Sequence, residues 1–215
     1  WSLQSGPTGA VLTGANTPNL RAANLVVGDY VFRLTVTDDE NETAFDETSI
    51  SVLPEPSTND LALRINTGGS EVDYNGNTFD ADTYFNTGRT LDRPQTGLPE
   101  PYQTFRYSRS QQMSYDIPIP DGEYTVNLYF AELWFGATGG GSAGSGKRIF
   151  DVSIEGQLAE NNLDVFAEVG AETMLLKSYT VTVTDGVLDI DFDSRDAVGG
   201  ERHPVINAIE ILSVG

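Results

Sequence analysis

The stretch GEYTVNLYFAELWF, residues 122–135, decides the fold of the larger part of this chain. Every second position of its first half carries a large apolar side chain: Tyr124, Val126, Leu128 and Phe130. Alternation with period two is typical of a β-strand that buries one face. Trp134 and Phe135 follow directly after the alternation ends, and the glycine-rich segment 136–146 comes next. The stretch therefore predicts a core strand that delivers two aromatic side chains into a loop.

The same pattern recurs in the rest of this region. Apolar side chains alternate in three further segments: residues 150–154, 179–183 and 187–192. Asp185 and Gly186 form a strong hairpin-turn signal between two of them, and residues 205–212 are predicted to be a largely buried closing strand. No segment has the 3.6-residue apolar period of a convincing amphipathic helix. Residues 61–215 are therefore predicted to form an all-β domain, a two-sheet jelly-roll β-sandwich.

A shorter β segment precedes this domain. Residues 30–37 alternate, residues 48–52 form a second strand after an acidic turn, and Tyr30 follows Leu-Val-Val-Gly-Asp. That setting is typical of a tyrosine corner, in which the tyrosine hydroxyl bonds upstream backbone and locks a sandwich crossover. Residues 54–60 contain two prolines and are predicted to be a linker, because proline blocks both helix and ladder hydrogen bonds. Residues 1–53 are thus a separate module.

The composition excludes several classes of function. The 215 residues carry 12 Lys and Arg against 32 Asp and Glu, a formal net charge of −20. This charge argues against nucleic acids and anionic membrane surfaces as partners, because like charges repel. The sequence contains no run of about 18 apolar residues, so no membrane-spanning segment is predicted. With no cysteine and one histidine, His203, the chain offers no thiol chemistry and little basis for a histidine metal site.

A glycine-rich motif at residues 141–147, GSAGSGK, fits the first seven positions of a phosphate-binding loop. The eighth position should be Ser or Thr to hold magnesium, and it is Arg148. A strand follows where the motif requires a helix. The motif therefore indicates a flexible Gly/Ser loop, residues 136–146, between paired strands.

The acidic residues give two candidate calcium sites. Asp73, Asp80 and Asp82 crowd one loop together with Asn75, and carboxylate and amide oxygens are the ligands that calcium prefers. This loop is the candidate for a structural calcium, and no other cofactor is predicted. A second acidic series at period two on a strand, Asp189, Asp191 and Asp193, is better explained as a solvated face.

Catalytic patterns are weak. Glycoside hydrolysis requires two carboxylates at a set separation, and 32 acids make some pair inevitable. No Gly-x-Ser-x-Gly elbow is present. His203 precedes Pro204 with no evident nucleophile partner and is expected to be a surface loop residue.

Aromatic residues off the core alternation are more informative. Six of them fall at strand ends or in loops: Tyr84, Phe85, Tyr102, Tyr107, Trp134 and Phe135. Flat rings with polar neighbours are what sugars require, because C–H faces stack on the ring while hydroxyls find hydrogen-bond partners. The alternative is that half of these rings plug the ends of the sandwich.

The second segment resembles the malectin domain, a carbohydrate-binding jelly roll, in its secreted bacterial form. The matching motifs run in order over nearly all of residues 61–213: LRINTGG at 63–69, FDADTYF at 79–85, YQTFRY at 102–107, YDIPIP at 115–120, GEYTVNLYFAELWF at 122–135, RIFDV at 148–152 and INAIEI at 206–211. The resemblance implies a galactose-binding-like jelly-roll β-sandwich, with a sugar pocket built from loop aromatics and one acidic residue.

Carried over position by position, the resemblance places the family's aromatic residues at Tyr84, Tyr107, Trp134 and Phe135. Polar contacts are expected from neighbouring loops, with Glu132 and Arg202 as candidates. The family's late acidic residue has no clean equivalent, because Arg-His-Pro at 202–204 occupies its place, with Glu201 or Asp196 as substitutes. This departure leaves the family's glucose-disaccharide specificity open.

The first segment resembles the second half of a PKD domain, an immunoglobulin-like module. The resemblance rests on Trp1 with SGP at 5–7, on LVVG at 25–28 with Tyr30, and on LTVTD at 34–38. The family's first strands have no counterpart in these residues. Residues 1–53 are therefore expected to be a truncated sandwich with an incomplete sheet and an exposed edge.

Together these features predict a non-catalytic carbohydrate-binding module of an exported multidomain protein, secreted or on the cell surface. The expected partner is a neutral, glucan-like glycan, alongside neighbouring domains of a larger chain. The alternative is a protein-interaction or adhesion module that binds no sugar. Acidic polysaccharides are poor ligands for so acidic a chain unless calcium bridges the two or four arginines gather locally: Arg106, Arg109, Arg148 and Arg202.

Overall fold

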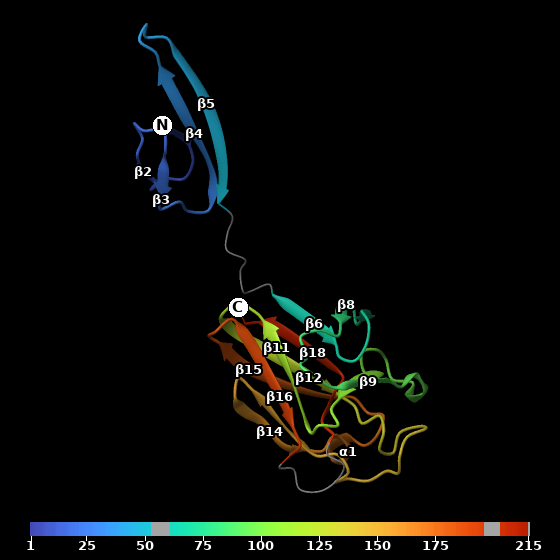
Figure 1. The fold of residues 1–215 in the computed structure, drawn as a ribbon. Helices are drawn as coiled ribbons and strands as arrows, with labels where there is room; N and C mark the ends of the chain where they lie inside the picture. Colours follow the sequence, from blue (N-terminus) through green and yellow to red (C-terminus); the bar gives the residue numbers. More distant parts are fainter. Residues whose placement is uncertain (53–60, 196–202, 215) are drawn as a thin grey trace. The chain divides into compact units, whose positions relative to one another are not determined.

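The computed structural model describes residues 1–52, 61–195 and 203–214. The chain divides into two compact units, residues 1–57 and 58–215 (Figure 1). The linker predicted at residues 54–60 lies outside the described residues. Among these residues no helix is long and apolar enough to cross a membrane.

The first unit contains a three-stranded sheet and a separate two-stranded hairpin. The sheet has the order β1-β4-β5, and β2 pairs with β3. The strands are β1 (Ser2–Ser5), β2 (Val11–Thr13), β3 (Arg21–Ala23), β4 (Gly28–Thr37) and β5 (Thr43–Val52).

Tyr30 anchors this unit as predicted. Its ring is fully buried, and its hydroxyl donates to the carbonyl of Val26 at 2.9 Å and accepts from the Val26 amide at 2.8 Å. The tyrosine corner is thereby confirmed.

The burial of the β4 and β5 faces stops partway along the sheet. Tyr30 and Phe32 are buried, but Val36, Phe45 and Ile50 are 59%, 63% and 43% exposed. Ile50 pairs with Tyr30 and so shares the face of Tyr30 and Val36, whereas Phe45 lies on the opposite face beside Arg33. Within the described residues the apolar face of this sheet is therefore only partly covered.

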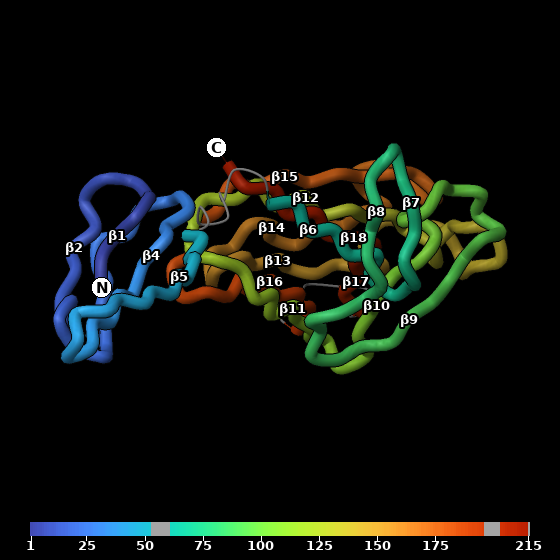
Figure 2. Tube along the Cα trace, turned by 90° about the horizontal axis from the view of Figure 1, so that it is seen from above, coloured from blue at the N-terminus to red at the C-terminus, as the bar shows by residue number. Residues whose placement is uncertain are grey.

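The second unit is a β-sandwich, as predicted. A six-stranded sheet of order β15-β12-β18-β6-β8-β7 and a four-stranded sheet of order β11-β16-β13-β14 form its two layers, and a three-stranded sheet, β17-β10-β9, lies at one end (Figure 2). The strands are β6 (Ala62–Asn66), β7 (Val72–Tyr74), β8 (Asn77–Ala81), β9 (Arg89–Asp92), β10 (Thr104–Tyr107), β11 (Gln112–Pro118), β12 (Gly122–Phe130), β13 (Phe150–Ile154), β14 (Gln157–Leu163), β15 (Leu175–Val183), β16 (Val187–Asp193), β17 (Val205–Ile206) and β18 (Ala208–Ser213). One 3₁₀ helix, Pro94–Thr96, and one short helix, α1 (Val165–Val169), complete the described elements.

Strand β12 is central to the core. Its four alternating apolar residues are fully buried: Tyr124, Val126, Leu128 and Phe130. Side chains from both sheets pack against them, including Phe150 of β13, whose ring centre lies 6.1 Å from that of Phe130. Burying a large apolar side chain contributes roughly 1.5–3 kcal/mol, so this strand holds the two layers together.

Two connections differ from the sequence-based expectation. Asp185 and Gly186 do not close a hairpin, because β15 belongs to the six-stranded sheet and β16 to the four-stranded sheet. Likewise, the glycine-rich loop at residues 136–146 does not join paired strands, since β12 and β13 lie in opposite sheets. Local turn signals identify a reversal of the chain but carry no information about which sheet each strand enters.

The acidic series on β16 alternates with the core residues Leu188, Ile190 and Phe192, so it lies on the outward face. Asp189 stands opposite Asp116 of β11 in register. The pKa of Asp191 is raised by partial burial and then by the neighbouring Asp189, Asp116 and Asp193. This face places like charges side by side.

Asp191→Asn should therefore stabilise the protein at neutral pH, by up to about 1 kcal/mol at this exposed position. The pKa of Asp191 is higher in the folded protein than in the unfolded chain, where it is about 3.9. The contribution of this carboxyl to the free energy of unfolding is therefore fully present below the unfolded pKa and is lost as the pH rises through the folded pKa. The stabilisation by Asp191→Asn should consequently vanish below about pH 4, where the carboxyl is protonated in both states. Urea unfolding at pH 7 and pH 3.5 measures it, with Glu71→Gln, an exposed acid outside this series, as control. An equal gain at both pH values would contradict the explanation.

Candidate functional site

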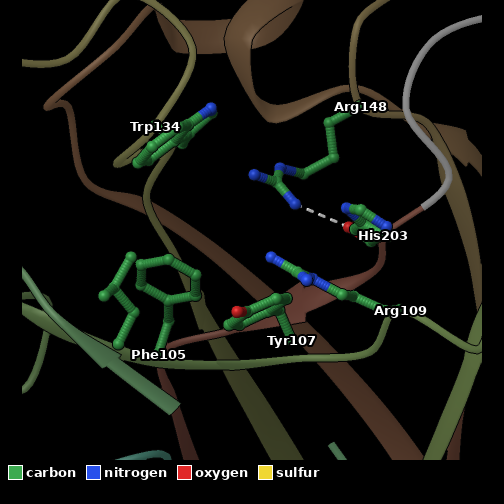
Figure 3. A pocket seen from close by; sticks show the side chains of 7 residues that line it. Phe105, Tyr107, Arg109, Trp134, Arg148 and His203 are labelled. Atoms are coloured by element: carbon green, nitrogen blue, oxygen red, sulfur yellow. Dashed lines mark hydrogen bonds between the residues drawn. The ribbon is translucent and has the colours of Figure 1, made fainter. Parts of the chain in front are cut away.

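A pocket of about 190 Å³ lies in the second unit beside β10. Figure 3 shows its side chains pointing toward one another around the open space. Its lining residues are Leu91, Phe105, Tyr107, Arg109, Trp134, Arg148 and His203.

Strand pairing explains how four of the seven lining residues come together. Phe105 and Tyr107 are two residues apart on β10, so they project from the same face of the strand. Leu91 of β9 stands directly opposite Phe105 in the antiparallel register. On the other side, Tyr107 pairs with Val205 of β17, and His203 lies two residues before that pairing, with its ring centre 6.3 Å from that of Tyr107.

Trp134 enters the pocket from the loop after β12, and its position is fixed from several directions. Its amide donates to Glu132 Oε1 at 2.8 Å, and its carbonyl accepts from the Gly141 amide at 2.7 Å. The guanidinium carbon of Arg93 lies 5.3 Å from the ring centre, within the range of a cation–π contact. The ring is 39% exposed, so a substantial part of it remains available to a ligand.

Arg148, which lines the pocket, forms a buried ion pair with Glu132, which lies behind it. The side chains of Arg148 and Glu132 are 7% and 1% exposed, and Arg148 Nε lies 2.7 Å from Glu132 Oε2. Glu132 Oε1 also accepts the amides of Trp134 and Phe135, at 2.8 and 2.9 Å. Arg148 Nη1 donates to the carbonyl of His203 at 2.6 Å. This pair therefore joins the Trp134 loop, the start of β13 and the segment before β17.

The structure brings only part of the predicted set into the pocket. Tyr107 and Trp134 line it. Phe135 is 5% exposed and packs 5.2 Å from the Arg148 guanidinium, so it supports the pocket without lining it. Glu132 is fully engaged with protein groups and acts as a positioning residue. Tyr84 lies outside the lining, where its carbonyl accepts the Asp116 amide at 3.0 Å.

Arg202, with the substitutes Glu201 and Asp196, lies outside the described residues. Of the other loop aromatics, Tyr102 is 4% exposed and belongs to the core. This agrees with the alternative that some of these rings fill the ends of the sandwich instead of binding a ligand.

Sequence reasoning did not assign five of the lining residues to the site: Leu91, Phe105, Arg109, Arg148 and His203. The spacing of Phe105, Tyr107 and Arg109 is a signal that could have identified two of them, because alternate residues follow one face of a strand. His203, expected on a surface loop, instead lines the pocket. The ion pair between Glu132 and Arg148 has no such periodic signal.

Two acids of the predicted calcium loop accept hydrogen bonds from protein groups, and calcium binding there stays a prediction. Asp82 is engaged by protein donors, because Arg106 Nη2 lies 2.7 Å from Oδ2, the Gly68 amide donates to Oδ2 at 2.6 Å and the Tyr115 hydroxyl donates to Oδ1 at 2.9 Å. Asp73 accepts from the Thr78 hydroxyl at 2.8 Å. Within the described residues, no three His, Cys, Asp or Glu side chains are grouped to hold a metal ion.

The glycine-rich loop is shaped around Trp134. A Cβ atom added to Gly140 would lie 2.0 Å from the Trp134 carbonyl oxygen, a backbone atom that cannot move independently of the loop. Phe135 and Gly141 also form an isolated β-bridge, and the Gly136 amide donates to the Gly141 carbonyl at 2.9 Å. The glycines therefore allow this loop to pass close to the backbone that carries the tryptophan.

Gly140→Ala should displace the Trp134 loop and weaken ligand binding by at least about tenfold, which corresponds to about 1.4 kcal/mol. Titration calorimetry with a sugar that binds the unaltered protein measures the loss. Ser145→Ala, an exposed position of the same loop, is the matched control and should bind normally. Unchanged affinity for Gly140→Ala would show that the close approach does not position the ring.

The fold and the pocket define a β-sandwich module with an aromatic, basic ligand pocket. Residues 61–209 match the family model described as Malectin domain, and the chain belongs to that family. Residues 1–52 match the model described as K319L-like, PKD domain.

Among curated relatives, a probable LRR receptor-like serine/threonine-protein kinase of Arabidopsis thaliana is 35% identical over 155 residues, covering 66% of this chain and 15% of the kinase. Malectin-A of Xenopus laevis is 36% identical over 90 residues, covering 41% and 30%. Human malectin is 32% identical over 90 residues, covering 41% and 28%. This chain thus spans a minor part of each relative. These plant and vertebrate relatives give no support to the expected bacterial origin.

Solved structures show the same fold. The ectodomain of ANX2 from Arabidopsis thaliana has a TM-score of 0.60 at 18% identity, covering 83% of this chain and 60% of the ectodomain. A beta-glucuronidase of Bacteroides uniformis has a TM-score of 0.54 at 20% identity, covering 92% of this chain and 24% of the enzyme. At this level of identity the likeness concerns the fold alone.

Proposed function

We propose that this chain is a non-catalytic carbohydrate-binding module, in which a sugar ring stacks against Trp134 and Tyr107. The observation that carries the proposal is the convergence of these two rings with three nitrogen-rich side chains on one pocket: Arg109, Arg148 and His203. Aromatic faces bind the C–H surface of a sugar, and fixed polar groups set its orientation. Membership of the malectin family supports this interpretation.

The pocket size fits a small ligand. At about 190 Å³ it is smaller than the roughly 300–1,000 Å³ typical of sites for drug-sized molecules. A pocket of this size suits one sugar ring, with the rest of a longer glycan outside. The neutral glucan predicted from sequence is one ligand of this class.

The chemistry of the lining supports binding without turnover. Glycoside hydrolysis uses two carboxyl groups on either side of the scissile bond, and the seven described lining residues include no Asp or Glu. The nearby carboxylate of Glu132 is occupied by three protein donors. We therefore assign the pocket to recognition alone.

The curated relatives support an extracellular setting, since they include a receptor-like kinase. A module of this kind, joined to a PKD domain in one chain, would hold neighbouring parts of a secreted or surface protein near a glycan.

A second candidate function is protein contact through the first unit. It rests on the exposed apolar side chains Val36 and Ile50, which share one face of the paired strands β4 and β5, since β edges and apolar patches are common contact surfaces. Ile50→Ser should abolish such an association and leave sugar binding unchanged, whereas an association that survives this substitution would contradict the second candidate.

Titration calorimetry of the whole chain against a panel of mono- and oligosaccharides tests the main proposal. We expect at least one sugar to bind with a dissociation constant in the micromolar to millimolar range, about −8 to −4 kcal/mol. Folded protein that binds no sugar at millimolar concentration would contradict the proposal.

A further inference from the structure

The charges around the pocket are opposite in sign to the charge of the chain as a whole. Acidic residues outnumber Lys and Arg by 32 to 12, yet both charged residues in the lining, Arg109 and Arg148, are basic. Glu132 balances Arg148, so within the described residues the unbalanced positive charge of the pocket is that of Arg109, which an anionic ligand would neutralise.

Arg148 presents unused hydrogen-bond donors to the pocket. Its Nε is paired with Glu132 and its Nη1 with the carbonyl of His203, and within the described residues Nη2 has no hydrogen-bond partner. The oxygens of Glu132 are taken up by Arg148 Nε and by two backbone amides. The pair therefore places donors, and no acceptor from Glu132, on the pocket side.

Arg109 contributes a charge that no acid balances. It is exposed and forms no ion pair with a carboxylate in the described part of the chain. Figure 3 shows its guanidinium and that of Arg148 directed into the same space, on the side of the pocket away from Phe105. The pocket thus has an apolar side and a cationic side.

We infer that the preferred ligand is an acidic sugar, a uronic acid whose carboxylate binds between Arg109 and Arg148 while its ring stacks on Trp134. This inference rests on the proposed function. A planar guanidinium matches a carboxylate with two parallel hydrogen bonds, and the aromatic side of the pocket accepts the apolar face of the sugar.

The net charge of −20 does not oppose this inference. At physiological ionic strength the Debye length is about 8 Å, so surface acids beyond that distance are largely screened while the two arginines contact the ligand directly. Of the four arginines whose local grouping would admit an acidic sugar, Arg109 and Arg148 lie together at the pocket. Arg106 takes no part, because Asp82 binds its guanidinium.

The test compares sugars that differ only in the carboxylate. Methyl glucuronide and methyl glucoside, and methyl galacturonide and methyl galactoside, each in both anomers, are titrated into the whole protein at 50 and 300 mM NaCl. We expect at least one uronide to bind at least tenfold more tightly than its neutral partner at low salt, with the difference shrinking at high salt. Glucose 6-sulfate is included to distinguish a carboxylate site from a general anion site.

Arg109→Gln should lower the affinity for the uronide at least tenfold and the affinity for its neutral partner by much less, so that the preference for the uronide is lost. Arg21→Gln removes an exposed arginine of the first unit and should change neither. Neutral sugars that bind as tightly as uronides would overturn the acidic-sugar inference while leaving carbohydrate binding intact. Binding of the sulfate but not of the uronides would overturn it as well. If no sugar binds to the folded protein, the proposed function itself fails.

Discussion

Trp134→Ala is expected to weaken sugar binding by about thirtyfold or more, the effect of losing an interface anchor worth roughly 2 kcal/mol. The ring lines the pocket and keeps 39% of its surface exposed, so its removal takes away the main stacking surface. The fold should persist, because the core under β12 is untouched. Calorimetric titration measures affinity, and circular dichroism with urea unfolding checks the fold.

Tyr84→Ala is the matched control, since Tyr84 is similarly exposed at 42% but lies outside the pocket lining. The resemblance places this tyrosine in the sugar site, and the structure does not, so the two sources make opposite predictions. Normal binding by Tyr84→Ala supports the pocket described above. Loss of binding in Tyr84→Ala with normal binding in Trp134→Ala would relocate the site to the Tyr84 region.

Glu132→Ala should cost about 3–5 kcal/mol of unfolding free energy in the second unit, because it leaves Arg148 buried without its counter-ion. Three hydrogen bonds to the carboxylate disappear at the same time. Sugar affinity should fall too, through displacement of the Trp134 loop. Urea unfolding of the whole chain, with hydrogen exchange to report each unit separately, measures the loss.

A double-mutant cycle with Arg148→Met distinguishes the ion pair from general damage at this position. The double variant should be more stable than the sum of the single losses predicts, by about 1–3 kcal/mol. Glu132→Gln keeps one acceptor for the amides of Trp134 and Phe135, so it should retain part of the stability if Glu132→Ala fails to fold. Glu168→Ala, which breaks a pair at the exposed end of Lys177, should cost no more than about 1 kcal/mol. Strictly additive losses would show that Glu132 and Arg148 act independently.

The fold was largely predictable because its signals are local and periodic. The alternation on β12 identified a core strand, and the residues before Tyr30 identified the tyrosine corner. The assignment of strands to sheets was not predictable from Asp185 and Gly186, because a turn signal fixes the reversal of direction but not the hydrogen-bond partner.

The site was predictable only in part. Trp134 and Tyr107 were identified because they carry family motifs and lie off the core alternation. The partnership of Glu132 with Arg148 joins the end of β12 to the start of β13 across two sheets, and no sequence period links such positions. The sequence likewise does not show that Arg106 binds the carboxylate of Asp82, one of the acids of the predicted calcium loop.

The central claim is that the pocket beside Trp134 binds sugar, and the indole N–H signals of the protein test it most directly. The chain has two tryptophans, Trp1 and Trp134, so a ¹⁵N-labelled sample gives two indole signals that single Trp→Phe variants assign. On titration with a sugar that binds, the Trp134 signal should shift saturably with the calorimetric dissociation constant, while the Trp1 signal stays in place. Saturable binding by calorimetry with no shift at Trp134 would contradict the claim.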